Sequence, residues 1–307
     1  MDLKYQPYSY TPILGWSISR YETFDKCKRQ YFFNYYSKFV KNVPQYKIMQ
    51  LKELTSVALE IGNVVHDVVE AFLKRLQKSD SNIDENRFFV YAKEKTDQYF
   101  SSKTFMETYY GLYETIDRAK AFEKIGACLK NFITSPMFTW LFMKAITNKN
   151  NWMIEPPGYG ETRLCGLKAY CKMDFLFPVG NDIYILDWKT GAKDTYKHSQ
   201  QLIGYAAAAS NNFSIPWNAI FPKIIYLYPT FEEFEIPLTE QDFSAFYKRI
   251  MQQTQEMHAY CQDVQNNIPL PMENFPCSPS STLCRFCNFS ELCHGKENAP
   301  AASEGAF

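Results

Sequence analysis

Apolar residues recur at helical spacing along the first half of the chain. From residue 56 to 77 they return every three or four positions, which is the period of one buried helix face. This face consists of Val57, Ile61, Val64, Val65, Val68 and Phe72. The same kind of pattern predicts a helix over about 20–36 and mainly helical structure over about 85–147.

The pattern changes at Pro156-Pro157, where short β-leaning runs replace the helical period. Three such runs lie within residues 160–188, and a fourth, KIIYLYP, begins at Lys223. Helices are predicted over about 198–210 and 239–264. Strands and helices in this mixture indicate an α/β protein.

The order of these patterns predicts one domain between two loose ends. We expect residues 1–16 to be a flexible lead, 17–295 to form the domain, and 296–307 to be a disordered tail. The domain would comprise a helical region over about 17–150, an α/β core over about 151–235, and a C-terminal helix with a cysteine-rich segment over about 236–295.

Composition narrows the class of protein. Hydrophobic residues make up 46% and aromatic residues 17% of 307 residues, which excludes a disordered chain. The formal net charge is zero, so a nucleic-acid partner would have to bind a local basic patch. No apolar run is long enough for a transmembrane helix, and the N-terminus does not resemble a signal peptide. We therefore expect a cytoplasmic, intracellular protein with no membrane partner. Its nine cysteines then favour free thiols and a metal site over disulfides.

The stretch KMDFLFPVGNDIYILDWKTG predicts a hairpin that brings two carboxylates together. Gly180-Asn181 is a good two-residue turn, because both residue types tolerate positive φ. Residues would then pair across the strands when their numbers add to 361. Asp174 and Asp187 would therefore face each other with Cβ atoms about 5 Å apart.

Two opposed carboxylates repel unless a positive charge lies between them, and a divalent cation supplies one. Lys189 emerges on the same face as Asp187. This combination suits phosphodiester hydrolysis by a metal-activated water. The alternative is a surface hairpin with an ordinary Asp–Lys ion pair, since Asp-x-Lys alone carries little information. Asp2-Leu3-Lys4 is the same triplet, but no predicted hairpin or opposed carboxylate accompanies it.

Four motifs in order resemble the RecB-like branch of the PD-(D/E)XK nuclease superfamily. They are Gly62-x-x-x-His66, Asp174, Asp187-Trp188-Lys189-Thr190-Gly191, and Gln201-x-x-x-Tyr205. The resemblance runs from about residue 17 to 293. It implies a restriction-endonuclease-like mixed central sheet flanked by helices, with a helical N-terminal half.

The resemblance also implies roles for these residues. His66, Asp174, Asp187 and the main-chain carbonyl of Trp188 would bind Mg²⁺ or Mn²⁺, and Lys189 would be the catalytic lysine. Gln201 and Tyr205, which share a helix face, would contact DNA phosphates and join the catalytic set. For His66 and Tyr205, plain core packing is the alternative that the residues alone leave open.

A cysteine cluster near the C-terminus indicates a second metal site. The spacing of Cys284, Cys287 and Cys293 is typical of zinc or iron–sulfur ligands, and a fourth ligand is needed. Cys277 would complete a local zinc site, and a further alternative is that these cysteines bind no metal. Alternatively, Cys27 lies where RecB/AddB-type and CRISPR-associated nucleases carry a lone N-terminal cysteine. That resemblance implies a [4Fe–4S] cluster on Cys27, Cys284, Cys287 and Cys293, as a cap joining the chain ends. The other cysteines lack ligand spacing and are expected to be core thiols: Cys128, Cys165, Cys171 and Cys261.

Basic and aromatic residues alternate around the first predicted helix. Arg20, Lys28 and Arg29 lie among tyrosines and phenylalanines, which would suit single-stranded or frayed DNA. The alternative is that the aromatic residues are core and the charges are solvated.

These features together favour a metal-dependent deoxyribonuclease. The resemblance implies exonuclease action in repair, recombination, or phage or CRISPR DNA processing, with a helicase as a possible partner. Two rivals remain: a nuclease-like module that binds DNA or a helicase without cutting, and a zinc-stabilised structural protein.

Overall fold

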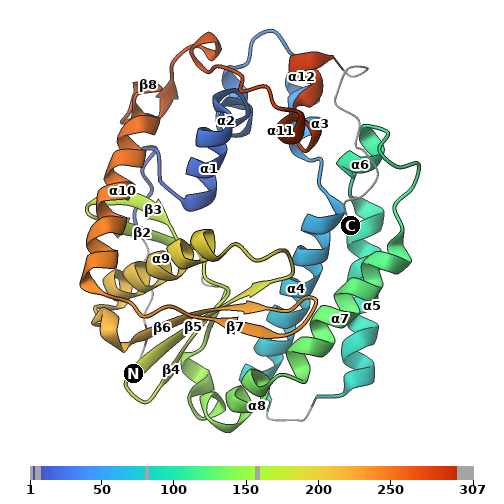
Figure 1. Cartoon of the computed structure of the whole chain (residues 1–307), viewed down its shortest axis with the longest axis vertical. Helices are drawn as coiled ribbons and strands as arrows, with labels where there is room; N and C mark the ends of the chain where they lie inside the picture. The colour runs from blue at the N-terminus through green and yellow to red at the C-terminus, as the bar shows by residue number, and fades with distance from the viewer. Residues whose placement is uncertain (1–2, 4–7, 80–82, 156–159, 296–307) are drawn as a thin grey trace. The chain divides into compact units, whose positions relative to one another are not determined.

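The computed structural model describes residue 3 and residues 8–79, 83–155 and 160–295 (Figure 1). The tail expected over 296–307 lies outside the described residues, as do residues 1–2 and 4–7 of the expected lead.

The chain divides into two compact units, each assembled from separate stretches of sequence. Unit 1 consists of residues 1–11, 61–98 and 119–252, and unit 2 consists of residues 12–60, 99–118 and 253–307. Three of the boundaries lie well inside helices, Val57–Lys78, Glu85–Ser102 and Glu240–His258, so the helical period continues through them and does not reveal the division.

Helices dominate the described residues. The α-helices are α1 (Ile18–Lys26), α2 (Lys28–Tyr35), α3 (Gln45–Lys52), α4 (Val57–Lys78), α5 (Glu85–Ser102), α6 (Met106–Tyr109), α7 (Arg118–Ile133), α8 (Pro136–Met143), α9 (Thr195–Phe213), α10 (Glu240–His258), α11 (Ser281–Arg285) and α12 (Ser290–His294). Short 3-10 helices are η1 (Ser37–Phe39), η2 (Ala145–Asn151), η4 (Trp217–Ala219) and η5 (Met272–Asn274). Helix α4 confirms the helix predicted over 56–77.

The helix predicted over 20–36 is in fact two helices, α1 and α2. Cys27 separates them in an extended conformation, with φ −155° and ψ 110°. Its Sγ accepts a hydrogen bond from the backbone N–H of Gln30, so Cys27 caps the start of α2. An apolar pattern continues through such a cap, which is why it does not reveal the break.

The strands form one mixed sheet and two small hairpins. They are β1 (Met153–Ile154), β2 (Glu161–Leu164), β3 (Leu167–Tyr170), β4 (Phe175–Val179), β5 (Asp182–Lys189), β6 (Ile220–Tyr226), β7 (Glu232–Phe234), β8 (Cys261–Asp263) and β9 (Ile268–Pro269). The sheet has the order β1-β4-β5-β6-β7, with β5 and β6 parallel and the other neighbours antiparallel. This mixed sheet with flanking helices confirms the predicted α/β class and is consistent with a restriction-endonuclease-like fold.

The register of the β4–β5 hairpin confirms the prediction from its turn. Phe175 pairs with Leu186 and Val179 pairs with Asp182, so every pair adds to 361. Gly180 has φ 61°, the left-handed conformation that a two-residue hairpin turn requires at this position.

The two faces of β5 carry different residues because side chains alternate along a strand. Tyr184 packs edge to face with Trp140 of α8, and Trp188 packs edge to face with Phe132 of α7, so these helices cover one face. Helix α9 packs on β6 (Figure 1). Tyr205 of α9 donates a hydrogen bond to Asp187, whose side chain lies on the other face of β5. The polar site residues therefore lie on the α9 side of the sheet.

Several described residues of the expected lead are buried or hydrogen-bonded. Leu14 and Trp16 are buried, and the Trp16 indole donates a hydrogen bond to Gln253 at 2.8 Å. Tyr8 also donates to Asn212, at 3.2 Å. These apolar and aromatic side chains fix residues that the polar start of the chain led us to consider loose.

The core of unit 2 is built from aromatic residues of α1 and α2. Phe24, Tyr31, Phe32, Phe33 and Tyr36 are all buried. Phe32 packs on Phe275 and Phe33 packs on Phe289, which come from the far end of the chain. For these five rings the core interpretation is therefore correct, and they cannot stack on DNA bases, whereas Tyr35 of the same segment is exposed.

The cysteines outside the cluster differ from one another in burial. Cys128 and Cys171 are buried, as expected of core thiols, and Cys261 is half-buried. Cys165 is exposed, so its prediction as a core thiol is wrong. It lies in the β2–β3 turn with φ 51°, and its position in the turn leaves the side chain exposed. Within the described part of the chain, no helix combines the length and the apolar character needed to cross a membrane.

Candidate nuclease site

Helix α4 carries His66 to the end of strand β5. Gly62 lies one turn earlier, and a Cβ atom there would come 3.4 Å from Thr190 Oγ1, so the glycine permits a close approach of helix and strand. His66 Nε2 lies 3.0 Å from the carbonyl oxygen of Trp188. Its other ring nitrogen, Nδ1, lies 3.4 Å from Asp174 Oδ2.

The hairpin holds Asp174 and Asp187 in a buried position. Asp174 directly precedes β4, and its Oδ2 accepts a hydrogen bond from the backbone N–H of Trp188 at 2.8 Å. The exposed fractions are only 7% for Asp174 and 3% for Asp187. Burial of two carboxylates is unfavourable without compensating charge or hydrogen bonds, so their partners define the site.

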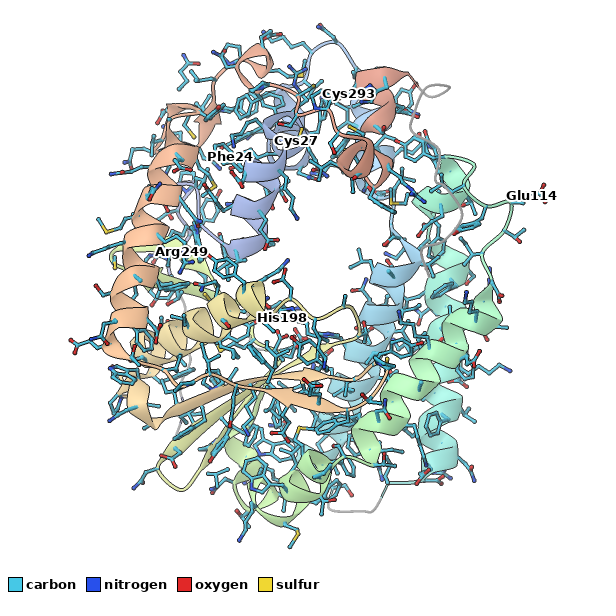
Figure 2. The ribbon with its side chains drawn as sticks, viewed as in Figure 1. Phe24, Cys27, Glu114, His198, Arg249 and Cys293 are labelled. Carbon is cyan, nitrogen blue, oxygen red and sulfur yellow. The ribbon has the colours of Figure 1, made fainter. Side chains whose placement is uncertain are left out.

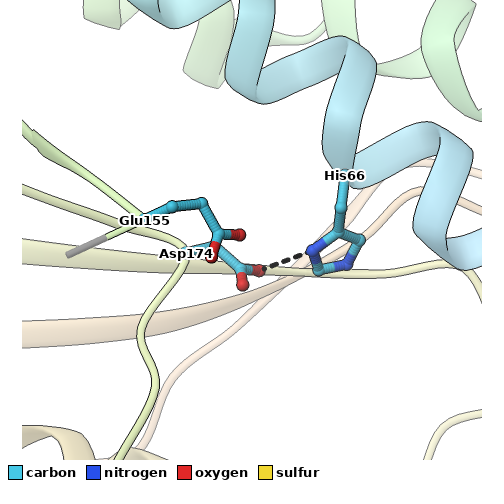
Figure 3. Close-up of side chains that lie close together, drawn as sticks. All are labelled: His66, Glu155 and Asp174. Atoms are coloured by element: carbon cyan, nitrogen blue, oxygen red, sulfur yellow. Dashed lines mark ion pairs between the residues drawn. The ribbon is translucent and has the colours of Figure 1, made fainter. Parts of the chain in front are cut away.

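Glu155 joins this site, although no sequence pattern selects it. The side chains of His66, Glu155 and Asp174 converge, and one ligand atom from each lies within 4.8 Å of the others (Figure 3). Strand β1 pairs Ile154 with Phe175, which places Glu155 beside Asp174. Glu155 has φ 47°, an unusual conformation for a non-glycine residue, and Lys172 Nζ lies 2.6 Å from its Oε2.

Asp187 has its own partners on the α9 side. Lys189 forms an ion pair with Asp187 Oδ2. The Tyr205 hydroxyl donates a hydrogen bond to Asp187 Oδ1 at 2.5 Å. Gln201 lies one turn before Tyr205 on the same helix face, and among the described residues its buried Oε1 has no hydrogen-bond partner.

The charges of the site shift the pKa values of its members. Burial lowers the pKa of His66, but the nearby Asp174 carboxylate outweighs burial and raises it to about 9. Burial and the charge of Asp174 raise the pKa of Asp187, against the opposing effect of Lys189. Burial also raises the pKa of Asp174, but His66, the Trp188 N–H and Lys189 together hold it below its usual range. The site thus holds excess negative charge, and a proton on His66 partly offsets it.

The structure therefore brings together most of the site residues that the sequence predicts. His66, Asp174, Asp187, Trp188, Lys189 and Tyr205 are linked by the contacts above. Two details differ from the expected ligand set: the Trp188 carbonyl faces His66, and Glu155 groups with His66 and Asp174. Glu155 directly follows β1, and a strand of two residues gives no usable sequence pattern.

The clustered cysteines form a second site, entirely within unit 2. One small cavity is lined by Cys27, Cys277, Cys284, Cys287 and Cys293. Two of these lining residues are labelled in Figure 2: Cys27 lies at the α1–α2 junction, and Cys293 lies on α12. Burial raises the pKa of Cys287 to about 11, and burial with the neighbouring Cys277 raises that of Cys293 to about 12.

Several hydrogen bonds hold the segment that carries these cysteines. Asn288 Nδ2 donates to the Leu54 carbonyl at 2.8 Å, and Tyr110 donates to the Asn288 carbonyl at 2.7 Å. Glu291 accepts from Tyr109 at 2.9 Å and pairs with Lys47 at 2.5 Å. The cysteine positions are thus set by α3 and α6 as well as by the local chain.

The basic residues predicted to bind DNA have partners inside unit 2. Arg20 donates to the Gly15 carbonyl at 2.5 Å and lies over the Tyr35 ring. Lys28 donates to the Phe24 carbonyl at 2.7 Å, and Arg29 Nε donates to the Phe275 carbonyl at 2.8 Å. All three remain partly exposed. In the structure these three side chains therefore stabilise unit 2 by hydrogen bonds to its backbone carbonyls.

Comparison with known proteins identifies the family. A search of curated proteins finds no match to this sequence. The family model of the PD-(D/E)XK nuclease superfamily matches residues 15–294, which include both the carboxylate site and the cysteine cavity. The chain therefore belongs to the PD-(D/E)XK nuclease superfamily, whose members are typically metal-dependent nucleases.

Proposed function

We propose that this chain is a deoxyribonuclease that hydrolyses phosphodiester bonds with Mg²⁺ or Mn²⁺, acting as an exonuclease on DNA ends. The observation that carries the proposal is the convergence of His66, Glu155 and Asp174 beside the Asp187–Lys189 pair. Family membership supports the same reaction class.

The donor set fits a divalent cation. Carboxylate oxygens and one imidazole nitrogen are ligands that Mg²⁺ or Mn²⁺ accepts, and three of them already lie within 4.8 Å of one another. We assign His66, Asp174 and Asp187 as ligands, with the Trp188 carbonyl and Glu155 as further oxygen donors. A bound cation would lower the pKa of a water and polarise the phosphate at this position.

The remaining residues orient the site. Lys189 holds its ammonium against Asp187, where it would stabilise charge that develops on the phosphate. Tyr205 fixes the orientation of the Asp187 carboxylate through its hydroxyl. The Gln201 amide oxygen has unused hydrogen-bonding capacity on the same helix face, which suits a contact to an attacking water.

We predict that metal affinity rises with pH. In the metal-free chain His66 has a pKa of about 9, so below that pH it must lose a proton before it binds a cation. Affinity for Mn²⁺ should therefore increase by up to about tenfold per pH unit between roughly pH 6 and 8, as expected when one proton is displaced. Titration calorimetry in two buffers of different ionisation enthalpy measures the affinity and the released proton. In a His66→Gln variant the Mn²⁺ affinity should depend less on pH. A wild-type affinity that does not change with pH would contradict the prediction.

Tyr205→Phe is predicted to lower kcat about tenfold while metal affinity changes little. The variant removes only the hydroxyl that orients Asp187, the equivalent of one hydrogen bond of about 1.4 kcal/mol. Tyr247→Phe is the matched control, because Tyr247 is a half-buried tyrosine of unit 1 whose ring lies against Phe243 and Phe246. Equal rates for Tyr205→Phe and the wild type would remove Tyr205 from the catalytic set.

A [4Fe–4S] cluster on Cys27, Cys284, Cys287 and Cys293 is the second part of the proposal. Its support is the small cavity of unit 2 that these four cysteines line together with Cys277. The 3.8 Å between the Cys277 and Cys293 sulfurs is also the separation of two sulfurs bound at about 2.3 Å from one zinc ion, so the local zinc set is the alternative.

The proposed substrate is single-stranded or frayed DNA. Arg20, Lys28 and Arg29 remain partly exposed while they hydrogen-bond within unit 2, so these basic side chains can still reach phosphates. We place the activity in repair, recombination, or phage or CRISPR DNA processing, with a helicase as a candidate partner.

The exonuclease mode is tested with matched circular and linear single-stranded DNA in Mn²⁺. An exonuclease degrades the linear strand and leaves the closed circle intact, whereas cutting of the circle would show endonuclease action. A parallel RNA strand tests the preference for DNA. Tight DNA binding without cleavage of any strand would favour the non-cutting binding module instead.

A further inference from the structure

Two cysteine side chains of the cavity are in direct contact. The Sγ atoms of Cys277 and Cys293 lie 3.8 Å apart, although 16 positions separate the residues in sequence. Both residues are exposed, whereas Cys27, Cys284 and Cys287 are half-buried. The contact therefore joins the two cysteines of this cavity that a solute reaches most easily.

Five thiols at this cavity exceed the needs of a four-ligand group. In the proposed set the fifth thiol is Cys277, and it touches the ligand Cys293. A small rotation of either side chain would bring the two sulfurs to bonding distance, because they already lie in contact.

We propose that Cys277 and Cys293 form a reversible disulfide by exchange with a small disulfide such as oxidised glutathione. The Cys277 thiolate attacks one sulfur of the small disulfide, whose S–S bond breaks and releases one thiolate. Cys293 then attacks the Cys277 sulfur of the mixed disulfide and releases the second. The two protons that the cysteines lose pass to the two released thiolates. The protein gives up two electrons, and the small disulfide takes up both.

The disulfide would control the metal group, a consequence that rests on the proposed function. Once bonded to Cys277, Cys293 can no longer act as a ligand, so the cluster loses one of its four thiolates. Reduction would restore the ligand. Cys277 thus acts as a redox-sensitive release for the cluster.

Peptide mapping of the metal-free full chain tests the disulfide without reference to the cluster. The chain is treated with oxidised glutathione, alkylated and digested with trypsin. Cleavage after Arg285 places Cys277 and Cys293 on separate peptides, so fragment ions of the linked pair identify the bonded residues. We expect the Cys277–Cys293 link as the main product, and we expect dithiothreitol to reverse it. The link should be absent in Cys277→Ser and retained in Cys165→Ser, which is the exposed-thiol control. A main product with glutathione left on Cys277, or with other cysteines linked, would overturn the proposal.

The second arm follows the anaerobically purified, iron-containing chain as oxidised glutathione is added. Absorbance at about 400 nm reports the cluster. We expect the wild type to lose this absorbance at least about three times faster than Cys277→Ser, in step with formation of the link. Equal rates would overturn the release role. If the reduced wild type contains no iron, the cluster proposal fails, while the peptide map still decides the disulfide.

Discussion

Replacement of Asp174 by asparagine is expected to lower metal-dependent DNA cleavage by at least about a thousandfold. The asparagine side chain has nearly the same shape, and its carbonyl oxygen can still accept the hydrogen bond from the Trp188 N–H. What disappears is the negative charge that faces His66 and groups with Glu155. The variant should therefore fold normally and bind Mn²⁺ much more weakly.

Asp182→Asn is the matched control for this variant. Asp182 lies in the same hairpin, at the first position of β5, and pairs with Val179 far from the carboxylate site. Cleavage rates, Mn²⁺ affinity and melting temperature would be measured for both variants. If Asp174→Asn cleaves DNA at a rate similar to Asp182→Asn, the carboxylate site is not the catalytic centre.

Cys27→Ser is expected to abolish iron binding and lower the melting temperature by roughly 5–10 °C. Serine is a good helix N-cap, so it can replace the Cys27 sulfur as acceptor for the Gln30 N–H at the start of α2. The helix cap is thus preserved while the proposed ligand is lost. Because Cys27 and the other cluster cysteines come from distant parts of the sequence, loss of the metal would leave them without a covalent tie.

Cys277→Ser separates the two possible ligand sets. The proposed cluster predicts that this variant keeps iron and the brown colour, whereas a local zinc site on Cys277, Cys284, Cys287 and Cys293 predicts that it loses metal. Metal analysis of both variants, with Cys165→Ser as an exposed-thiol control, gives a direct answer. Metal retained in Cys27→Ser and lost in Cys277→Ser would establish the local set.

The sequence predicts the fold best where a local pattern determines the structure. The turn at Gly180-Asn181 fixes the register of β4 and β5, so the positions of Asp174 and Asp187 follow from the sequence alone. The apolar face of α4 is equally regular, and it brings His66 to the sheet. Spacing of four residues likewise places Gln201 and Tyr205 on one face of α9.

The features that sequence reasoning missed depend on contacts between distant segments. Glu155 enters the site through β1, which has two residues and pairs with a strand about twenty positions away. The break at Cys27 follows from its capping geometry, which apolar periodicity does not encode. The aromatic residues of α1 and α2 are core because Phe275 and Phe289 pack on them from the other end of the chain. The same alternation of basic and aromatic residues suits a DNA surface equally well until those partners are known.

The most direct test of the central claim is cleavage of end-labelled single- and double-stranded DNA with Mg²⁺ or Mn²⁺, comparing the wild type with Lys189→Ala. Lys193→Ala is the control, because Lys193 pairs with Glu232 outside the carboxylate site. We predict metal-dependent degradation by the wild type and the control, and a loss of about a hundredfold or more in Lys189→Ala. Wild-type chain that is purified anaerobically, binds DNA and leaves every substrate uncut in both metals would contradict the account.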